Sequence, residues 1–423
     1  MKGIEEKQIE APYELPEGWK WCRLGEVADW GSGGTPSRKN PEYYQGSIPW
    51  IKTGELNETY IFDSEEKVSE DAIKHSSAKI FPKETVVMAM YGATIGKTAI
   101  FGIDASTNQA CACAICHKEL DNHFLFNFLK SKKDYFLYNA KGGAQPNISQ
   151  EIIKNTLIPL PPTLAEQQRI VKRIESMFAK LDEAKEKAQN VVDSFETRKA
   201  AILHKAFTGE LTAKWRKENG VSDDSWVEKL FDSCIAKMQN GLSKRSGNEG
   251  EETVVLRLAN MGEDDFDVSD LRTIKLTSKE KNNYSLAKND VVMIRVNGSK
   301  TNVGRQLLVK NNKGWSFCDH IIRIQFEVFC LPNYMVYFSK TKEYIDYVQD
   351  NMVSSAGQNT ISRKGLSNLS LKVPTLPEQQ EIVRILEIII EKENKAKQAA
   401  EAVLEQIDLL KKSILARAFR GEL

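Results

Sequence analysis

The chain has 423 residues, which is too long for one compact core and predicts two or three domains. With 41% hydrophobic and 28% charged residues, its composition excludes a disordered tail or a collagen-like rod. The 59 Lys and Arg residues nearly balance the 58 Asp and Glu residues, so binding to a polyanion would need a local basic surface. We find no membrane-length apolar run and no signal or transit pattern. These features and the odd number of cysteines predict reduced thiols in a cytoplasmic protein.

Four segments follow one another along the chain. Residues 1–158 and 212–371 contain short β-rich runs between Gly, Asn and Ser turns, with helical patches after the strands, and we expect each to form an α+β recognition domain. Residues 159–211 and 372–423 have helical periodicity instead. The predicted fold is therefore α+β, with two globular domains joined by two long helices.

The two helical segments are copies of each other. PTLAEQQRIV at Pro162–Val171 returns as PTLPEQQEIV at Pro374–Val383, and AFTGEL at Ala206–Leu211 returns as AFRGEL at Ala418–Leu423. No residue is inserted or deleted between these motifs, and about 22 of the 50 aligned positions are identical. Fainter echoes link the two domains: VVMAMYGATIGK resembles VVMIRVNGSK, and GGAQPNIS resembles AGQNTIS. The chain is thus an internal duplication whose helices kept their length.

Each helical segment has start and stop signals. Thr163 and Glu166 predict an N-terminal capping box, and Thr375 and Glu378 repeat it. Prolines mark the start of each segment, at Pro159, Pro161 and Pro162 in the first and at Pro374 and Pro377 in the second. Gly209 and Gly421 stand where the helices should end. Between these signals apolar residues recur at spacings of three and four over about six heptads, which predicts an antiparallel coiled coil between the two segments.

One charged residue interrupts the apolar seam of each helical segment. These residues are Arg198 in the first segment and Glu393 in the second. If the small alanines in the middle of the two seams cross, the two charges lie within about one helical turn of each other. We therefore expect Arg198 and Glu393 to pair and to help set the antiparallel register. The alternative is that both side chains reach out to solvent from the rim.

Several motifs resemble catalytic or metal sites but lack an essential part. Tyr91-Gly-Ala-Thr-Ile-Gly-Lys97 is one residue short of a phosphate-binding P-loop and has tyrosine in place of the first glycine. Asn40-Pro-Glu-Tyr43 comes near an amino-methyltransferase turn but has no Gly-rich cofactor loop before it. Cys111, Cys113, Cys116 and His117 lack a second ligand pair, and their alternation indicates a half-buried strand. The sequence predicts neither an enzyme nor a metal site.

The duplicated layout, the PxxxEQQxIV openings and the AFxGEL closings resemble the specificity subunit of type I restriction–modification systems. This resemblance covers essentially the whole chain. It implies that each domain reads one half of a bipartite double-stranded DNA target, while the helices set the spacer and dock two modification (methyltransferase) subunits. Restriction subunits, which are ATP-dependent nucleases and translocases, would join through these. The chain itself would bind no cofactor; S-adenosylmethionine, ATP and Mg would act on the partner subunits.

Loops that combine Gly, Ser or Thr, Asn or Gln and a cation supply the candidate DNA contacts. Cations hold phosphates, while Asn, Gln and some Arg read base edges. In the first domain the candidates are Arg38, Lys39, Lys52, Tyr91, Thr94, Lys97, Asn108, Gln145 and Asn147. In the second they are Lys244, Arg245, Arg257, Arg295, Asn297, Ser299, Lys300, Arg305, Gln358 and Asn359. The bland interpretation, that such loops are simply hairpin turns, holds for about half of them taken singly.

Two other classes of function compete with this one. A coiled-coil adaptor that binds proteins would favour exposed apolar loop tips, whereas these tips are rich in Gly, Asn and Lys. A complete DNA-modifying enzyme would need a cofactor-binding βαβ unit, which we do not find in the sequence. The second domain departs from the first at one of these places, since Val254–Met261 lacks the Pro-Trp of Ile48–Ile51.

Overall fold

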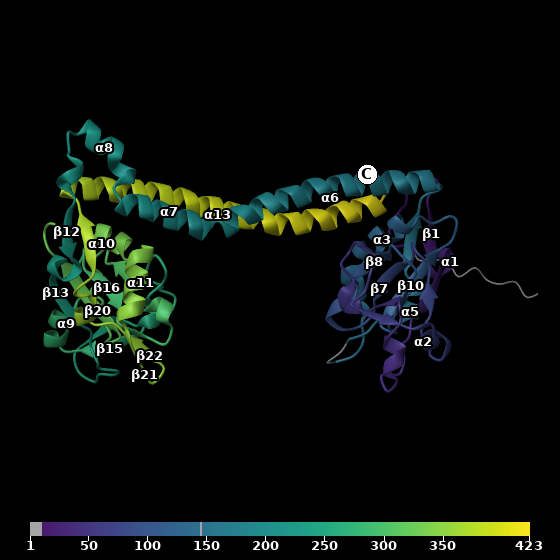
Figure 1. Cartoon of the computed structure of the whole chain (residues 1–423), viewed down its shortest axis with the longest axis horizontal. Coiled ribbons are helices and arrows are strands. Elements are labelled where there is room, and N and C mark those ends of the chain that lie inside the picture. The colour runs from purple at the N-terminus through teal and green to yellow at the C-terminus, as the bar shows by residue number, and fades with distance from the viewer. Residues whose placement is uncertain (1–10, 144–145) are drawn as a thin grey trace, which may run out of the picture. The chain divides into compact units, whose positions relative to one another are not determined.

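The computed structural model describes residues 11–143 and 146–423, which divide into two compact units. Unit 1 contains the chain up to Gln189 together with Ala402–Leu423, and unit 2 contains Asn190–Glu401. Each unit combines several sheets with helices (Figure 1). Among the described residues, no helix is both long enough and apolar enough to cross a bilayer.

Unit 1 begins with short strands and helices and ends in a long helix. Its strands are β1 Lys20–Arg23, β2 Ala28–Ser32, β3 Ile48–Ile51, β4 Tyr60–Ile61, β5 Glu66–Val68, β6 Ile80–Phe81, β7 Val86–Ala89, β8 Thr98–Phe101, β9 Ala105–Thr107, β10 Cys111–Cys116 and β11 Leu157–Leu160. Its helices are α1 Leu24–Val27, α2 Glu70–Lys74, α3 Asn122–Ser131, α4 Lys133–Asn139, α5 Gln150–Asn155 and α6 Leu164–Asp193.

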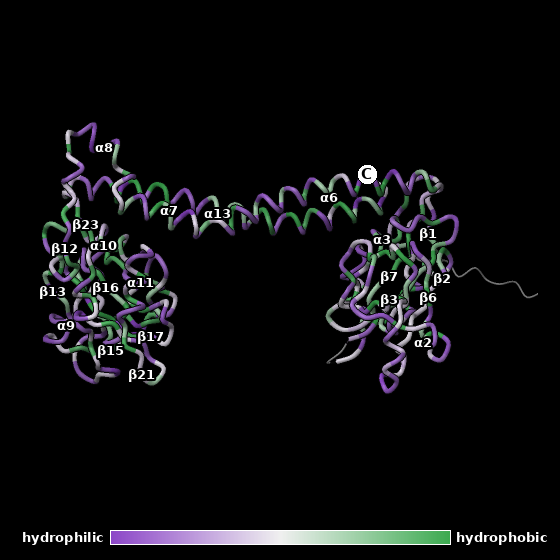
Figure 2. The backbone as a smooth tube through the Cα atoms, in the orientation of Figure 1, coloured by the Kyte–Doolittle hydropathy of each residue, from purple (hydrophilic) through white to green (hydrophobic). Residues whose placement is uncertain are grey.

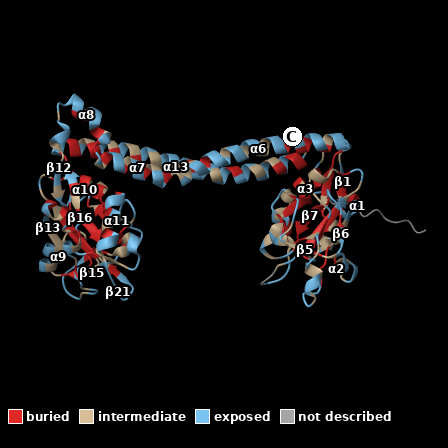
Figure 3. Cartoon of the chain, viewed as in Figure 1, coloured by how far each residue is buried: buried red, intermediate tan, exposed pale blue. Residues whose placement is uncertain are grey.

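The main sheet of unit 1 has the order β2-β10-β7-β8-β4 and is buried on both faces. Ala112 and Ala114 of β10 belong to one apolar cluster, whereas Cys111 and Cys113 belong to another. The expectation of a half-buried strand was therefore wrong, because a second sheet, in the order β5-β3-β9-β6, contributes residues that cover the face with the thiols. Burial raises the pKa of Cys113 to about 12. The central strands are accordingly hydrophobic (Figure 2) and buried (Figure 3).

Unit 2 contains more strands than unit 1 and the end of the first helical segment. Its strands are β12 Val227–Leu230, β13 Ile235–Asn240, β14 Glu251–Leu256, β15 Thr273–Leu276, β16 Val291–Ile294, β17 Val296–Asn297, β18 Gln306–Leu308, β19 Ser316–Phe317, β20 Ile321–Phe326, β21 Val353–Ser355, β22 Gln358–Thr360 and β23 Ser370–Val373. Its helices are α7 Phe195–Phe207, α8 Ala213–Glu218, α9 Ser278–Tyr284, α10 Pro332–Phe338, α11 Lys342–Asn351 and α12 Arg363–Leu366, and it shares α13 Leu376–Phe419 with unit 1.

The two units repeat one strand framework. The order β13-β20-β16-β18 in unit 2 corresponds to β2-β10-β7-β8 in unit 1, and β15-β14-β19 corresponds to β5-β3-β9. A two-stranded antiparallel pair, β1 with β11 or β12 with β23, joins the first and last strands of each repeat. The faint sequence echoes between the two halves therefore mark equivalent structural positions.

The long helices pack against each other within each unit. In unit 1, Ile174 of α6 shares an apolar cluster with Phe419 of α13, and Lys411 Nζ lies 2.5 Å from an Asp182 carboxylate oxygen. In unit 2, Leu203 of α7 shares a cluster with Leu386 of α13. As the residue number increases along the first helical segment, the number of its ion-pair partner on α13 decreases, so the helices run antiparallel (Figure 1).

The predicted Arg198–Glu393 pair is confirmed. The Arg198 Nε lies 2.8 Å from a Glu393 carboxylate oxygen, and both side chains are half-buried. Arg198 also bonds to the Ser194 hydroxyl and the Val191 carbonyl oxygen. At Ser194 the first helical segment divides into α6 and α7, whereas α13 is one helix of 44 residues. The Ser194 hydroxyl also donates to the Asn190 carbonyl oxygen, and a hydrogen bond of this kind distorts a helix locally.

The stop signals and the N-cap at Thr163 hold, but the first capping box lacks its return bond, because the Glu166 carboxylate accepts from Arg169 at 2.8 Å. Gly209 and Gly421 have φ of 85° and 74°, the left-handed backbone of a helix stop. Thr163 Oγ1 accepts from the Glu166 amide at 3.2 Å, as an N-cap should. The second capping box was wrong: Glu378 is fully buried and its carboxylate instead accepts from Arg216 and Thr212, each at 2.7 Å.

Candidate DNA interface

Each unit brings two parallel strands together under a glycine. In unit 1, β3 runs parallel to β9, and the Gly34 amide donates to the Thr107 carbonyl at 2.9 Å. A Cβ on the preceding Gly33 would lie 1.9 Å from that same carbonyl oxygen, so only glycine fits there. In unit 2, β14 runs parallel to β19, and Gly241 has the same restriction against Cys318. The candidate segments that follow these glycines therefore start from equivalent positions.

In unit 1 this region places Arg38 and Lys52 on one acidic residue. The Glu66 carboxylate lies 2.6 Å from Arg38 and 3.1 Å from Lys52. The hydrogen bond from Arg38, followed by that from Lys52, lowers the pKa of Glu66. The Arg38 guanidinium also stacks 4.0 Å from the centre of the Tyr44 ring. Lys52 also pairs with Glu65 at 3.1 Å, so these two predicted DNA contacts are balanced by two carboxylates within the unit, while Lys39 is exposed beside them.

In unit 2 the same region forms a pocket with a cationic rim. Lys244, Arg245 and Arg257, all predicted from the sequence, line a cavity of about 310 Å³ together with Arg272 and His320. We call this set the cationic pocket. Lys244 pairs with Glu280 at 2.9 Å, Arg245 with Asp319 at 2.8 Å, and Arg257 with Asp270 at 2.8 Å. Apolar side chains, including Val255 and Ile274, complete its wall.

A second loop pair follows the buried strand β7 in unit 1. The Gly92 amide donates to the Pro146 carbonyl at 2.8 Å, and Tyr91 and Asn147 pair through an isolated antiparallel β-bridge. Tyr91 is 44% exposed beside these bonds. Thr94 donates its hydroxyl proton to the Tyr91 carbonyl oxygen at 2.8 Å, so it holds the turn. The structure therefore brings together Tyr91 and Asn147, two candidates that the sequence places in separate loops; Gln145 lies outside the described residues.

The equivalent loops of unit 2 form the small sheet β17-β22-β21. Asn297 faces Asn359 in register, and Asn359 is buried, donating to the Gly298 carbonyl at 2.9 Å. The Asn297 side chain accepts from the Ser299 amide at 2.8 Å. These two asparagines thus shape the loop, whereas the neighbouring candidates Ser299, Lys300 and Gln358 are exposed.

Four other predicted residues lie away from these groups or serve the fold. Asn108 accepts from the Ala110 amide at 3.2 Å and so closes the turn before β10. Arg295 reaches the Asp319 carbonyl oxygen at 3.4 Å, and Arg305 reaches the Met261 carbonyl oxygen at 2.6 Å. Burial lowers the pKa of Arg305, as expected of a guanidinium that anchors a loop. Lys97 is half-buried, and its positive charge lies close enough to Glu58 to favour the ionised carboxylate there.

Sequence reasoning missed the repeated glutamine that docks each domain on its helix. Gln167 is fully buried; it accepts from the Asp121 amide at 2.8 Å and donates to the Glu119 carbonyl at 2.9 Å. Gln379, its copy, does the same with Leu331 and Phe329, both at 2.8 Å. The repeated EQQ motif was the available signal, since an amide has both a donor and an acceptor for one loop. Arg272 and His320 were also missed.

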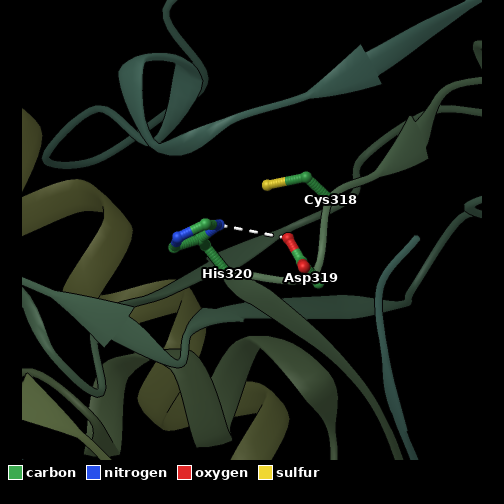
Figure 4. A group of neighbouring side chains, drawn as sticks. All are labelled: Cys318, Asp319 and His320. Carbon is green, nitrogen blue, oxygen red and sulfur yellow. Dashed lines mark hydrogen bonds and ion pairs between the residues drawn. The ribbon is translucent and has the colours of Figure 1, made fainter. Parts of the chain in front are cut away.

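Three consecutive residues near the cationic pocket have the composition of a metal site. The ligand atoms of Cys318, Asp319 and His320 lie within 4.8 Å of one another (Figure 4). Asp319 is already shared, however: its carboxylate accepts from His320 at 3.1 Å and from Arg245 at 2.8 Å. With His320 itself on the rim of the cationic pocket, this setting repels a cation and favours an anion.

Comparisons with known proteins agree with this duplicated architecture. A family model described as the type I restriction modification DNA specificity domain matches twice, at residues 16–193 and 234–406. The StySPI specificity subunit of Salmonella potsdam is 30% identical, over 97% of this chain and 90% of its own length. The EcoKI specificity subunit of Escherichia coli (strain K12) is 27% identical over the same shares. The solved HsdS subunit of Thermoanaerobacter tengcongensis has the same fold, with a TM-score of 0.66 at 21% identity over 98% of this chain and 100% of that one.

The chain therefore belongs to the family of type I restriction–modification DNA specificity subunits. Its function is DNA target recognition, and it is the non-catalytic recognition subunit of such a system. Subunits of this family bind DNA and assemble with the other subunits of the restriction–modification complex. The alternative of a protein-binding adaptor without DNA specificity has no support.

Proposed function

We propose that each unit reads one half of a bipartite DNA target, and that the two half-sites differ in sequence. The observation that carries this proposal is a repeated framework with different side chains at equivalent positions. Trp50 and Val255 both pair with a serine of the parallel strand, Ser106 or Ser316, yet they differ in size and chemistry. A common scaffold with divergent contact residues suits two related docking modes on two unlike sequences.

The reading surface of each unit consists of the two groups described above. The strand-end group contains Arg38, Lys39 and Lys52 in unit 1 and the cationic pocket in unit 2. The second group is the loop pair that carries Tyr91 and Asn147, or Asn297 and Gln358. Exposed cations would contact phosphates, and the exposed amides would contact base edges. Asn108, Arg295 and Arg305 then act through the shape of the loops that they hold.

We further propose that α6, α7 and α13 form an antiparallel coiled coil which sets the spacer between the half-sites and gives the molecule pseudo-twofold symmetry. Two observations support this: the heptad seam, and a helix α13 of 44 residues, which at ~1.5 Å per residue extends about 65 Å. A helix of this length with an apolar stripe needs a partner along its whole length. Its length is then a property of the recognised sequence.

The expected partners follow from the family. The helices would dock two modification subunits, which bind S-adenosylmethionine, and restriction subunits that use ATP and Mg would join through them. The complex would work in the cytoplasm, where the DNA that it reads is found. Exposed apolar residues on the helices, such as Leu409 at 67% and Leu410 at 49% exposed, provide contact area for such subunits.

Methylation mapping of host DNA tests the proposal. Single-molecule sequencing of strains with and without this gene should reveal one split motif, with a fixed unspecified spacer, methylated on both strands. Exchange of residues 20–160 for the same region of a relative should change one half of that motif only. A continuous palindrome, or a change in both halves, contradicts the assignment of one half-site to each unit.

A further inference from the structure

The two units carry opposite charges at one equivalent position beside their parallel strands. In unit 1, Trp50 pairs with Ser106 on one side and with Glu66 on the other. In unit 2, Val255 pairs with Ser316 on one side, and on the other its amide donates to the Arg272 carbonyl at 3.0 Å. Arg272 therefore stands in unit 2 where Glu66 stands in unit 1.

This charge reversal changes what the neighbouring cations are free to do. Glu66 accepts from both Arg38 and Lys52, and Lys52 also pairs with Glu65, so two carboxylates balance these two cations. Arg272 has no acidic partner among the described residues, and it is exposed. The other three cations of the pocket each pair with one carboxylate, from Glu280, Asp319 or Asp270. The cationic pocket thus has one positive charge without a counter-charge, at the position where unit 1 has Glu66. In unit 1 the charges of Arg38 and Lys52 are balanced, and the exposed Lys39 lies outside this group.

The walls of the cationic pocket make this charge more effective. Val255, Leu258, Ala259 and Ile274 line it together with the cations. Apolar walls displace water and lower the local dielectric constant, so an anion inside is attracted more strongly than one on an open surface. A cavity of about 310 Å³ is large enough for a phosphate group with part of its sugar. A guanidinium binds phosphate through two parallel hydrogen bonds, which also fixes its position.

We propose that the cationic pocket binds a phosphate of the DNA backbone, that Arg272 is its anchoring residue, and that unit 1 makes no equivalent contact because Glu66 occupies that position. This inference rests on the proposed role of unit 2 in DNA binding. Its consequence is an asymmetric complex, in which unit 2 supplies more of the sequence-independent, salt-dependent affinity and unit 1 depends more on base contacts.

The test compares Arg272→Gln with the wild-type full chain, co-purified with its modification subunits. Binding to a random-sequence duplex and to a target duplex is titrated at several salt concentrations. Loss of one phosphate contact should reduce the slope of log K against log salt by about 1, on both duplexes, with the preference for the target unchanged. Lys372→Gln, which removes an exposed cation of β23 in the same unit, is the matched control and should leave the slope unchanged.

A reciprocal variant tests the unit 1 half of the inference. Glu66→Gln removes one of the two carboxylates that balance Arg38 and Lys52 and leaves Lys52 with Glu65, so one cation is freed and the slope should become steeper by about 1. A separate arm adds inorganic phosphate in place of DNA and follows the thermal midpoint of wild type and Arg272→Gln. A rise in the wild type alone with an unchanged DNA slope would mean that the pocket binds free phosphate, and it would overturn the DNA assignment.

Two further results would overturn the inference. An unchanged slope for Arg272→Gln with an intact fold excludes the phosphate contact. A changed target preference at an unchanged slope would mean that Arg272 reads a base edge instead. If the wild-type complex binds neither duplex, the proposed function fails together with the inference, whereas the other two results leave the proposed function in place.

Discussion

The buried glutamine at the start of each long helix joins a recognition domain to that helix by side-chain hydrogen bonds. Gln379 has no exposed surface and bonds to three main-chain groups, of Leu331, Phe329 and Pro374. Removal of such a side chain leaves buried main-chain donors and acceptors without partners, and each of these costs about 1–3 kcal/mol.

We therefore expect Gln379→Ala to lower the free energy of unfolding of the full chain by about 2–4 kcal/mol, since more than one buried group loses its partner. Urea unfolding followed by circular dichroism measures this. Gln380→Ala, at the exposed neighbouring position, is the control and should change stability by less than about 0.5 kcal/mol. Equal effects of the two substitutions would show that the Gln379 bonds add nothing.

Glu378 shows why a motif in one sequence does not identify every contact. Thr375 followed by Glu378 has the spacing of a capping box, as does Thr163 followed by Glu166, and the prediction treats them alike. In unit 2, however, Arg216 of α8 lies against the start of α13 and donates a hydrogen bond to the Glu378 carboxylate at 2.7 Å. The segment with Arg216 follows the first copy of the repeat, so no local pattern around Glu378 indicates this partner.

At the scale of elements, Arg198 and Glu393 identify the register of α7 against α13. Reversal of one charge, Arg198→Glu, places two carboxylates together at a half-buried position, which we expect to destabilise the chain by about 1–3 kcal/mol. The double variant Arg198→Glu with Glu393→Arg should recover most of this loss if the pair sets the register. Thermal unfolding of the four chains of this cycle measures the coupling, and additive effects would contradict it.

The docking of α7 on its recognition domain depends on a group that titrates at low pH. Asp264 lies 3.8 Å from Lys199 of α7 and also pairs with Lys340 at the end of α10. Although burial opposes the shift, the hydrogen bond and charge of Lys340, together with Lys199, lower the pKa of Asp264. A lowered folded-state pKa stabilises the fold above the unfolded value of about 3.9, and this contribution disappears as the pH falls through the folded value.

Asp264→Asn should consequently reduce stability at pH 7, and the difference from wild type should shrink as the pH falls from the unfolded-state pKa through the lowered folded-state pKa, where the wild-type carboxyl becomes protonated in both states. Unfolding of both chains over this pH range gives the difference directly. Asp270→Asn is a suitable control because its carboxylate, 77% exposed, contacts Arg257 rather than a helix. A pH-independent difference between wild type and Asp264→Asn would show that size or shape, and not charge, is responsible.

The elements themselves were largely predictable. The heptad seam, the duplicated motifs and the stop glycines predicted both long helices, their antiparallel contact and the Arg198–Glu393 pair. The division at Ser194 was not predictable, because it involves a hydroxyl bond to Asn190 and a contact from Arg198 that depend on the packed geometry. The sequence identified candidate cations such as Arg38 and Lys244 but not the carboxylates that pair with them. The equivalence of Glu66 and Arg272 could not be predicted either, because it follows from the strand register.

At the scale of the whole molecule, the proposed coiled coil makes the length of the helices part of the recognised DNA sequence. Removal of Lys180–Glu186 together with Gln406–Lys412 deletes one heptad from each helix at facing positions and keeps the apolar seam in phase. The two ion pairs that join the helices in this stretch, Lys411 with Asp182 and Lys185 with Asp408, are removed as complete pairs. The deletion also removes Glu183 and Lys412, whose exposed partners Lys187 and Asp134 remain in the chain and lose these surface contacts.

The deletion removes about 10 Å of helix, at ~1.5 Å per residue, which corresponds to about three base pairs at ~3.4 Å each. Three base pairs also turn the duplex through about a third of its helical period, so the two half-sites no longer face the two units together. We expect methylation at the original sites to disappear, and any remaining recognition to require a shorter spacer. Genome-wide methylation mapping measures this, with Glu183→Ala plus Lys187→Ala as a control that alters the same helix surface at constant length. Methylation of the original sites by a complex that contains the shortened chain would show that helix length does not set the spacer, and it would refute the proposal.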